Sequence, residues 1–566
     1  MTSDRHPAKI TAAQLLVREL QLHGVDRVFC VPGESYLAVL DALYDAPEIK
    51  VVTCRHEGGA VMMADAYSRL TGRPGIAFAT RGPGATNASA GIHIAHQDSS
   101  PVILFIGDIE RGATERNSFQ EIDFETMFRP ITKFVKQIDD GRRIPELVSR
   151  AFYTATSGRP GPVVLSLYED MLLDEVTPSP SRPWKPVETT PSQAALAEFA
   201  ARLEQSARPV LIIGGGGWSA KGASDLRQFA ERWEIPVIAS FRCQDYVDNN
   251  SPAYIGNLGL GANPALAKVV RESDLVVLLG ARLGEVSSNS YSLLEIPAPK
   301  QDLVHIHPDP EELGSLYQPT LAICATPRCV ATSLAALPVP ENRPWASALP
   351  ALRQAYLDWT TPAPVHGKIQ MGEIMTWLRE ALPQDAIITN GAGNFAIWPN
   401  RFHRYRGYGT MLAPRSGSMG YGLPAAVAAK ITHPERQVVC FAGDGDFMMT
   451  ANELATALMQ QAPIIVILLN NAIYGTIRMH QERDYPERTC GTDLVNPDFV
   501  TLAKAFGAHG ERVTSTEEFA PAFERARASG RSAIIELVIE PELISPTETI
   551  TSLRQKAKAR LEAARQ

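Results

Sequence analysis

Short apolar runs alternate with amphipathic segments along most of the chain. In the first third, apolar runs long enough for buried strands cover residues 27–31, 51–54, 76–80 and 102–106. Segments with helical spacing separate these runs, and the clearest is residues 11–23, because Gly24 provides a natural stop. Strands that alternate with helices predict a parallel, doubly wound sheet.

The same pattern recurs twice, so the expected fold class is α/β, with three doubly wound parallel-sheet domains. Further strands are expected at residues 210–213, 236–240, 275–279, 303–306, 386–389, 437–442 and 464–469. Proline-rich stretches separate the domains at residues 177–192, 336–344 and 360–366. The expected domain limits are residues 1–176, 193–336 and 366–552. A C-terminal tail, 553–566, reads as an amphipathic or fraying helix.

Composition and charge narrow the class of partner. The chain has 566 residues, too many for one core, and its net charge of −8 gives no basic surface for nucleic acid or acidic lipid. Residues 1–6 are polar, unlike a signal peptide, and no apolar run approaches the ~20 residues that cross a bilayer. The seven cysteines form no C-x-x-C pair, which fits reduced thiols. We therefore expect a cytoplasmic protein with no membrane segment.

Oxygen-bearing side chains follow two neighbouring strands near the end of the chain. Gly443-Asp444-Gly445-Asp446 follows the strand at 437–442, and Asn470-Asn471 follows the strand at 464–469. The carboxyl ends of parallel strands are where open α/β sheets place ligands. Carboxylate and amide oxygens suit a magnesium ion that is also held by a ligand's phosphates. Taken singly, each half also reads as a plain Gly-Asp turn or an Asn-rich strand end.

A second group of motifs lies in the first third. Glu57 opens a helix, where an acid is common because it favours the helix dipole and needs no function. After the strand at 76–80 a loop is expected over residues 81–87, which contains Gly82-Pro83-Gly84-Ala85-Thr86-Asn87, and Asp98-Ser99 and Phe119-Gln120-Glu121 come later. Together with Asp444 and Asn471, these motifs resemble the thiamine diphosphate-dependent enzymes, in particular acetolactate synthase (large catalytic subunit) and its relatives. The resemblance spans nearly the whole chain.

The resemblance implies a pyrimidine-binding, a central and a diphosphate-binding domain, and roles for four residues at the reaction centre. Glu57 would hydrogen-bond the cofactor's pyrimidine ring and promote proton removal from the reactive carbon, which is favoured in a poorly solvated site. Phe119 and Gln120 correspond to residues near the bound substrates. Lys133 stands where acetolactate synthases carry a lysine, although a lone lysine also reads as a solvated charge.

The resemblance also assigns the residues that contact the cofactor. In the first domain they are Pro32, Gly33, Glu57, Thr80, Gly82 and Asn87. In the last domain they are Gly393, Asn394, Phe395, Ser418, Met419, Gly443, Asp444, Gly445, Asp446, Asn471, Ile473, Tyr474 and Gly475. Asp444, Asn471 and the backbone carbonyl of Ile473 would bind Mg²⁺. Met419 would hold the cofactor bent, and the alternative is a core methionine.

The implied reaction is decarboxylation of a 2-oxo acid such as pyruvate, followed by carboligation to a carbonyl acceptor. The family joins the Glu of one subunit to the metal motif of another, so a homodimer or homotetramer is expected. Several positions depart from the family: Phe395 and Ala396 replace His and Gln, His480 replaces Trp, and Glu34-Ser35-Tyr36 replaces small residues. A non-ligating decarboxylase or aldehyde lyase therefore stays open, as does a non-catalytic cofactor-binding protein, against which Glu57 counts. No G-x-S-x-G motif supports a serine hydrolase.

The middle domain raises the question of FAD, which anabolic acetolactate synthases bind there. The run Gly214 to Gly217 departs from G-x-G-x-x-G because Ser219 takes the place of the last glycine. Gly280-Ala281-Arg282 keeps a family motif, but the acidic pair and second arginine that usually follow it are replaced by Gly284-Glu285-Val286. These departures count against FAD, which stays an open alternative.

Overall fold

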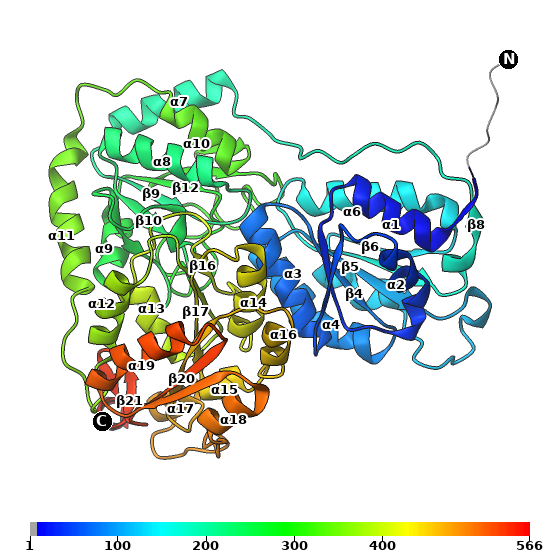
Figure 1. Ribbon diagram of the computed structural model, residues 1–566. Helices are drawn as coiled ribbons and strands as arrows, with labels where there is room; N and C mark the ends of the chain where they lie inside the picture. The colour runs from blue at the N-terminus through cyan, green and yellow to red at the C-terminus, as the bar shows by residue number, and fades with distance from the viewer. Residues whose placement is uncertain (1–7, 566) are drawn as a thin grey trace. The chain divides into compact units, whose positions relative to one another are not determined.

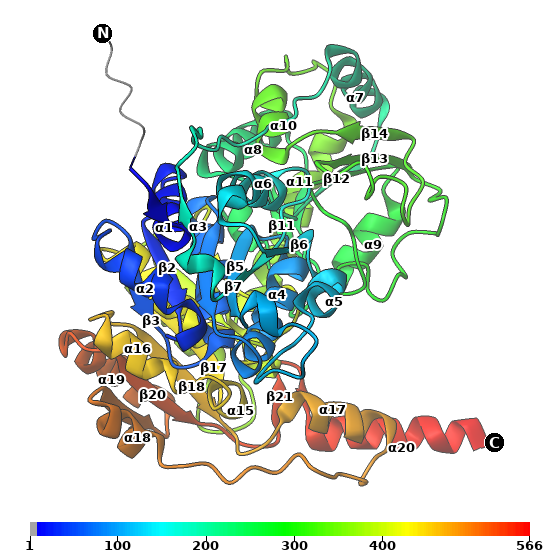
Figure 2. The ribbon, with the colours of Figure 1, turned by 90° about the vertical axis from the view of Figure 1, so that its right-hand side faces the viewer.

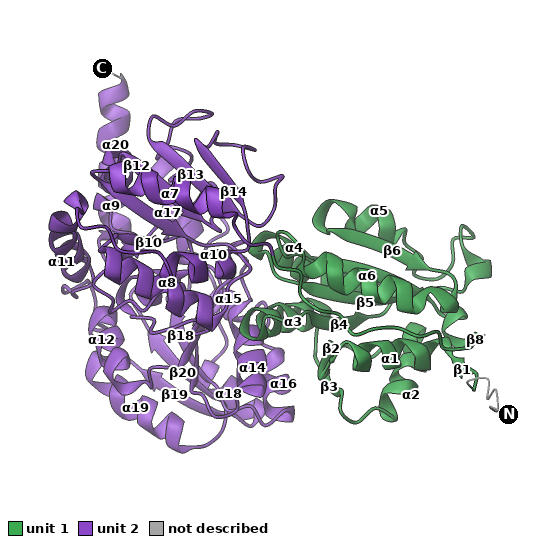
Figure 3. Ribbon diagram, turned by 90° about the horizontal axis from the view of Figure 1, so that it is seen from above, with its two compact units in different colours: residues 1–188 green, residues 189–566 purple. Residues whose placement is uncertain are grey.

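The computed structural model describes residues 8–565, and its contacts divide the chain into two compact units, Met1–Glu188 and Thr189–Gln566 (Figure 1 and Figure 3). The polar residues 1–6, on which the expectation of a cytoplasmic protein partly rested, lie outside the described residues, as does Gln566. Within residues 8–565, no helix combines the length and the apolar character needed to cross a bilayer.

The first unit is built on one six-stranded parallel sheet. Its strands, in spatial order, are β3 (Lys50–Thr53), β2 (Arg27–Cys30), β4 (Gly75–Ala79), β5 (Val102–Asp108), β7 (Val163–Tyr168) and β6 (Phe134–Ile138). Phe78 pairs with Phe105 in register, and the two rings stack with centroids 4.9 Å apart. A short antiparallel pair, β1 (Ile10–Thr11) and β8 (Glu175–Val176), joins the two ends of the unit.

Helices cover both faces of this sheet. One face packs against α1 (Ala12–Leu22), α2 (Leu37–Tyr44) and α6 (Ile144–Thr156). The helices α3 (Glu57–Thr71) and α4 (Pro83–Asp98) pack against each other and the sheet, and the short α5 (Phe124–Phe128) packs against β6. A local signal starts α1, where Thr11 and Gln14 form a capping box.

The second unit holds the other two six-stranded parallel sheets. The middle sheet runs β11 (Tyr254–Asn257), β10 (Val237–Ala239), β9 (Pro209–Ile213), β12 (Leu275–Leu279), β13 (Asp302–His307) and β14 (Leu321–Cys324). The third sheet runs β16 (Met411–Leu412), β15 (Ile387–Asn390), β17 (Val438–Gly443), β18 (Ile465–Asn470), β20 (Ala533–Val538) and β19 (His509–Val513). A small hairpin, β21 (Leu543–Ser545) and β22 (Glu548–Thr549), follows.

Helices flank both sheets of this unit (Figure 1). Around the middle sheet lie α7 (Gln193–Gln205), α8 (Ala220–Trp233), α9 (Ala265–Glu272), α10 (Pro327–Ala335) and α11 (Leu349–Trp359). Around the third sheet lie α12 (Met371–Ala381), α13 (Ile397–Phe402), α14 (Gly422–Thr432), α15 (Asp444–Phe447), α16 (Glu453–Met459), α17 (Gly475–Asp484), α18 (Phe499–Phe506) and α19 (Thr516–Ala528). The three sheets confirm the expected α/β class.

Strand order relates the three sheets. Numbered by their occurrence along the chain, the strands of the first sheet are arranged 2-1-3-4-6-5, and those of the third sheet have the same order. The middle sheet is arranged 3-2-1-4-5-6. In the first and third sheets the order reverses between strands 1 and 3, so a crevice is expected at the carboxyl ends of β2 and β4 and of β15 and β17.

Two helix boundaries differ from expectation. The loop expected over residues 81–87 is shorter, because α4 begins at Pro83, where proline's fixed φ and missing N–H suit a first helical turn. The C-terminal helix α20 (Ile550–Arg565) begins before the expected limit of 553 and lies alongside α17 (Figure 2). An ion pair joins Arg554 Nη2 to the buried Glu482 Oε1 at 2.7 Å, so this helix is docked, not fraying.

Candidate functional site

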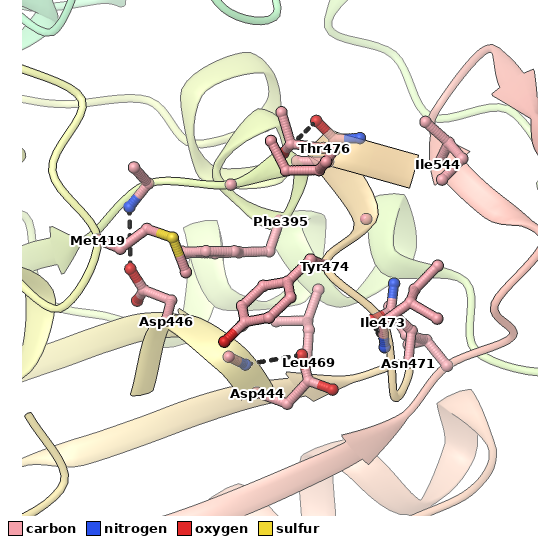
Figure 4. Close-up of a pocket in the computed structure, with 18 of the residues that line it drawn as sticks. Phe395, Met419, Asp444, Asp446, Leu469, Asn471, Ile473, Tyr474, Thr476 and Ile544 are labelled. Atoms are coloured by element: carbon pink, nitrogen blue, oxygen red, sulfur yellow. Dashed lines mark hydrogen bonds between the residues drawn. The ribbon is translucent and has the colours of Figure 1, made fainter. Parts of the chain in front are cut away.

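A cavity of about 250 Å³ lies at the carboxyl ends of the third sheet's strands (Figure 4). Its walls are the loops after β15, β16, β17 and β18 and the chain after β20. The expected cofactor contacts that line it are Gly393, Asn394, Phe395, Met419, Gly443, Asp444, Gly445, Asp446, Asn471, Ile473, Tyr474 and Gly475. The structure thus gathers these residues at one place, although their contact with a cofactor stays a prediction.

Asp444 stands at the junction of β17 and α15 and is 3% exposed. Its Oδ1 accepts a hydrogen bond from Gly445 N at 2.9 Å, and its Oδ2 accepts from Ala472 N at 2.9 Å. Burial raises the pKa of Asp444, because desolvation disfavours the charged form. A divalent cation beside this carboxylate would offset that penalty, so the site fits a metal ion.

The other expected metal ligands lie on the loop after β18. Asn471 Oδ1 accepts a hydrogen bond from Ile473 N at 3.3 Å, and an isolated antiparallel bridge between Ile473 and Asp493 fixes the loop. Among residues 8–565, no three His, Cys, Asp or Glu side chains cluster as a metal site. One carboxylate, one amide and one carbonyl leave room for a ligand's phosphates, as magnesium prefers.

Asn496 is a site residue that sequence reasoning missed. Its Nδ2 donates to Asp444 Oδ2 at 2.7 Å and to Asn470 Oδ1 at 2.9 Å. Asn496 thereby ties the metal motif to the asparagine pair and orients the carboxylate. It lies in a long irregular segment before α18, and nothing in the local sequence distinguishes it from an ordinary loop asparagine.

Close packing around glycines shapes the cavity wall. The Phe395 ring covers Gly443, where an added Cβ would lie 2.8 Å from Phe395 Cδ1. The Tyr474 ring covers Gly445 in the same way, at 2.5 Å from Tyr474 Cε1. Phe395, which replaces a family histidine, thus acts as an apolar wall over the start of the metal motif.

Polar groups lie at one side of the cavity, where α17 begins. Thr476 Oγ1 donates to Asn394 Oδ1 at 2.9 Å, which joins the start of α17 to the loop after β15 (Figure 4). The N-terminal turn of α17 faces the cavity through Gly475 and Thr476, and unpaired N–H groups at a helix start favour phosphate. These residues fit a diphosphate beside the metal ligands.

The loop after β16 contributes Met419, whose side chain lines the cavity. Its neighbour Ser418 is turned to the backbone, with Oγ donating to Met419 O at 3.3 Å. His480, expected to alter the substrate pocket, is exposed and does not line this cavity. The effect of His480 on substrate choice stays a prediction.

Asp446 lines the cavity, but its carboxyl oxygen Oδ1 binds backbone N–H groups of the protein itself. Its Oδ1 accepts hydrogen bonds from Ala392 N at 3.0 Å and from Gly420 N at 2.9 Å. Burial raises the pKa of Asp446 to about 7. Asp446 therefore acts on the loops that surround the cavity.

The chain after β20 supplies an apolar wall that was not expected. Ile539, Leu543 and Ile544 line the cavity, and Ile544 and Ile550 pack with Ile473 in one buried cluster. This segment covers the loop of a proposed metal ligand and keeps water from that side. Sequence reasoning missed it because short apolar residues near a domain's end read as ordinary core.

In the first unit, the expected residues gather at the carboxyl edge of the sheet. Glu57 is 8% exposed at the start of α3, and its Oε2 accepts a hydrogen bond from Asn87 Nδ2 at 3.0 Å. Its Oε1 lies over Gly84, where an added Cβ would come within 3.1 Å. The acid and amide therefore form one group, and the N-terminus of α3 favours the carboxylate's charge.

Tight backbone approaches surround this group. Gly33, which follows Pro32 after β2, lies against Thr80, where an added Cβ would be 2.4 Å from Thr80 Cβ. Gly82 has φ of 57° and lies against Gln120. A side chain at either glycine would displace the neighbouring loop.

Two further residues were expected near the reaction centre, Phe119 and Lys133. Phe119 is 73% exposed. Lys133 precedes β6, and its backbone N–H bonds Pro162 O just before β7. Because the sheet is parallel, Lys133 lies at the amino edge, opposite the edge that carries Glu57. The Lys133 ammonium donates to Ser157 O at the end of α6, so within this unit the structure does not bring Lys133 to Glu57, and its catalytic role stays a prediction.

The middle sheet has the strand order of dinucleotide-binding folds, and the loops at its switch point pack closely on each other. Ile213 and Gly280 form an antiparallel bridge across β9 and β12, and a Cβ on Gly215 would lie 1.9 Å from Gly280 O. Trp218 is 4% exposed and donates its indole N–H to Gly214 O at 2.8 Å. The loops that follow β9 and β12 are therefore closely packed at this switch point.

Three family models match the chain in sequence. They are described as the thiamine pyrophosphate enzyme N-terminal TPP binding domain, central domain and C-terminal TPP binding domain, and they match residues 10–127, 196–337 and 391–537. Thiamine pyrophosphate is another name for thiamine diphosphate. The three matches fall on the three sheets in the expected order, although the first ends before β6 and β7 and the last begins after β15.

Curated relatives match over most of their length. The acetolactate synthase large subunit of Parasynechococcus marenigrum is 34% identical over 527 residues, which are 90% of this chain and 84% of the relative. The acetolactate synthase isozyme 2 large subunit of Escherichia coli is 32% identical over 521 residues, 91% of this chain and 93% of the relative. A probable acetolactate synthase large subunit of Methanocaldococcus jannaschii is 30% identical over 564 residues, 96% of this chain and 95% of the relative.

Proposed function

Because the chain belongs to the acetolactate synthase family of thiamine pyrophosphate enzymes, we propose that it decarboxylates a 2-oxo acid and joins the remaining acyl group to a second carbonyl compound. One observation carries the proposal in the structure itself. Asp444, Asn471 and Ile473 line a single cavity whose other lining residues include the apolar Phe395, Leu543 and Ile544. This is the arrangement that a metal-bound diphosphate and a poorly solvated reaction centre require.

Different residues of the cavity would hold the cofactor and its metal ion. Thiamine diphosphate, when bound, supplies the carbon that attacks the 2-oxo group and takes up the electrons released with CO₂. Asp444 Oδ atoms, Asn471 Oδ1 and the Ile473 carbonyl would hold Mg²⁺, and Gly475 and Thr476 would bind phosphate oxygens. The walls formed by Ile544 and Leu543 exclude water, and an apolar environment favours loss of a carboxylate as neutral CO₂.

Glu57 would hold the pyrimidine end of the cofactor. Asn87 orients its Oε2, so the carboxyl group presents a fixed acceptor or donor to a ring nitrogen. We propose a homodimer, or a homotetramer built from dimers, as the active form. In it, Glu57 of one subunit would serve the metal motif of another.

The direct test of the function is the product formed from pyruvate. With thiamine diphosphate and Mg²⁺, two molecules of pyruvate should give one 2-acetolactate and one CO₂, measured by mass spectrometry and CO₂ release. A panel of 2-oxo acids and aldehydes then ranks donors and acceptors. Free acetaldehyde as the main product would support the non-ligating decarboxylase instead. No turnover of any 2-oxo acid by cofactor-loaded protein would overturn the proposal.

We further propose that the enzyme works without FAD, because the loops at the middle sheet's switch point pack closely on each other. Purified protein should therefore release no flavin on acid denaturation, as measured by visible absorbance and fluorescence. Stoichiometric flavin in the released fraction would contradict this expectation.

A further inference from the structure

We propose that Arg242, a residue of the middle domain, positions the walls of the cofactor cavity of the third sheet. It does so by hydrogen-bonding the carbonyl of the peptide between Gly391 and Ala392, whose N–H binds Asp446. The inference rests on the proposed function, since it concerns the same cavity. The inference gives the middle domain a role in shaping the cofactor cavity, and this role does not require the middle domain to bind a ligand.

Arg242 lies three residues beyond β10, at the carboxyl edge of the middle sheet, and is 2% exposed. Its Nη2 donates to Gly391 O at 2.8 Å, and its Nη1 donates to Pro414 O. Gly391 directly follows β15, and Pro414 lies two residues beyond β16. One planar guanidinium therefore joins the middle domain to the loops of two neighbouring strands in the third sheet.

The N–H of the same peptide unit is bound by an acidic side chain, that of Asp446. Ala392 N donates to Asp446 Oδ1 at 3.0 Å, while Gly391 O accepts from Arg242. The carbonyl and the N–H of a single peptide bond are thus bound by a buried cation and a buried carboxylate. The approach is close, because a Cβ on Gly391 would lie 2.0 Å from Asp446 Oδ1.

The loops held in this way form two walls of the cavity. The peptide that Arg242 and Asp446 bind is followed directly by three residues that line the cavity, Gly393, Asn394 and Phe395. Met419 lies between the two anchored points Pro414 and Gly420, the second of which donates its N–H to Asp446 Oδ1 at 2.9 Å. A shift of about 1 Å in such walls is enough to lower activity roughly 100-fold.

Contact between the middle domain and the third sheet does not depend on Arg242 alone. Asp245 Oδ2 accepts from Gly409 N at 2.9 Å, and Gln244 Nε2 donates to Asn400 O at 2.7 Å. Asn249 accepts from Tyr405 N at 3.1 Å. These bonds keep the two parts of the unit together when Arg242 is replaced, so a variant is expected to fold.

The matched control is Arg353, whose bonds reach no residue that lines the cavity, although one of them ends on Asn249, which also binds Tyr405. Its Nη1 donates to Tyr254 O at 2.7 Å and its Nη2 to Asn249 O at 2.9 Å, both within the middle domain. Replacing either arginine by methionine removes two charge-assisted hydrogen bonds to backbone carbonyls. Only Arg242→Met should disturb the cavity.

The experiment measures the Kd for thiamine diphosphate by calorimetry at saturating Mg²⁺, together with the melting temperature. Arg242→Met should raise this Kd about tenfold or more, in the range typical of residues that support a binding shell. Arg353→Met should lower the melting temperature and leave the Kd within twofold of wild type. Arg242→Lys should recover part of the affinity, because an ammonium can still donate to these carbonyls.

A second variant changes the same peptide on the side that faces Asp446. Gly391→Ala places a methyl group against Asp446 and should raise the Kd without any change at Arg242. An unchanged Kd in both Arg242→Met and Gly391→Ala would overturn the inference, as would an equal loss in Arg353→Met. If wild-type protein itself binds no thiamine diphosphate, the proposed function fails, and this inference fails with it.

Discussion

Replacing Glu57 by glutamine should lower kcat with pyruvate by roughly 10²- to 10⁴-fold, the range for loss of a group that transfers or holds a proton. Glutamine has nearly the same shape and keeps an oxygen that can accept from Asn87 Nδ2, as Glu57 Oε2 does at 3.0 Å. It cannot exchange a proton with a ring nitrogen as a carboxyl group does. Steady-state kinetics at saturating cofactor give the kcat, and calorimetry shows whether thiamine diphosphate still binds.

The matched control for this substitution is Glu146→Gln. Glu146 also stands in the first turn of a helix, α6, where it pairs with Arg143 on the surface. If an acid at a helix start served only the helix dipole, both variants would behave alike. We expect Glu146→Gln to keep full activity. A Glu57→Gln enzyme that turns over pyruvate at the wild-type rate would refute the assigned role.

Replacing Asp444 by alanine should abolish metal-dependent cofactor binding, with a loss of affinity greater than the ~10- to 100-fold typical of supporting residues. The buried carboxylate is the only charged group among the three proposed Mg²⁺ ligands. Titration of thiamine diphosphate at several Mg²⁺ concentrations measures the loss. Asn496→Ala gives a graded companion, since Asn496 Nδ2 only orients Asp444 Oδ2 at 2.7 Å and its loss should cost less.

Asp498→Ala is the matched control for the metal site. Asp498 caps α18 by accepting from Thr501 N at 2.7 Å, so its loss should lower the melting temperature without changing the Mg²⁺ dependence. Magnesium affinity that survives in Asp444→Ala would contradict the metal assignment.

The two inactive variants also test the proposed dimer when they are combined. A hybrid of a Glu57→Gln subunit and an Asp444→Ala subunit rebuilds one intact site only if each site takes Glu57 from one chain and Asp444 from the other. Random exchange between subunits of a twofold dimer should then restore up to about a quarter of wild-type activity. If each site were formed within one chain, the mixture would stay inactive.

Sequence patterns predicted most of the fold because buried parallel strands are short, continuous apolar runs. The strands at residues 275–279 and 303–306 correspond to β12 (Leu275–Leu279) and β13 (Asp302–His307). Helix starts were less certain, and α4 begins at Pro83 inside the expected loop. A glycine-proline pair reads as a turn until the following residues are known to be helical.

The gathering of Asp444, Asn471 and Ile473 at one cavity could be predicted because these residues closely follow strands, where topology alone brings them together. Asn496 and Ile544 could not, because each reaches the cavity from an irregular segment whose path depends on tertiary packing. Arg242 belongs to a different sheet and touches the loops of the third sheet only through backbone carbonyls, which no side-chain motif records. Lys133 lies at the edge of the sheet opposite Glu57 within its own unit, so its catalytic role stays a prediction that this sheet does not test.

The repeated strand order of the first and third sheets is the trace that duplication of one ancestral domain would leave. Glu57 follows strand 2 of the first sheet, and Met419 follows strand 2 of the third. Thr80 follows strand 3 of the first sheet, and Asp444 follows strand 3 of the third. The expected acid Glu57 and the proposed metal ligand Asp444 thus follow different strands, strand 2 and strand 3, of two sheets that share one strand order.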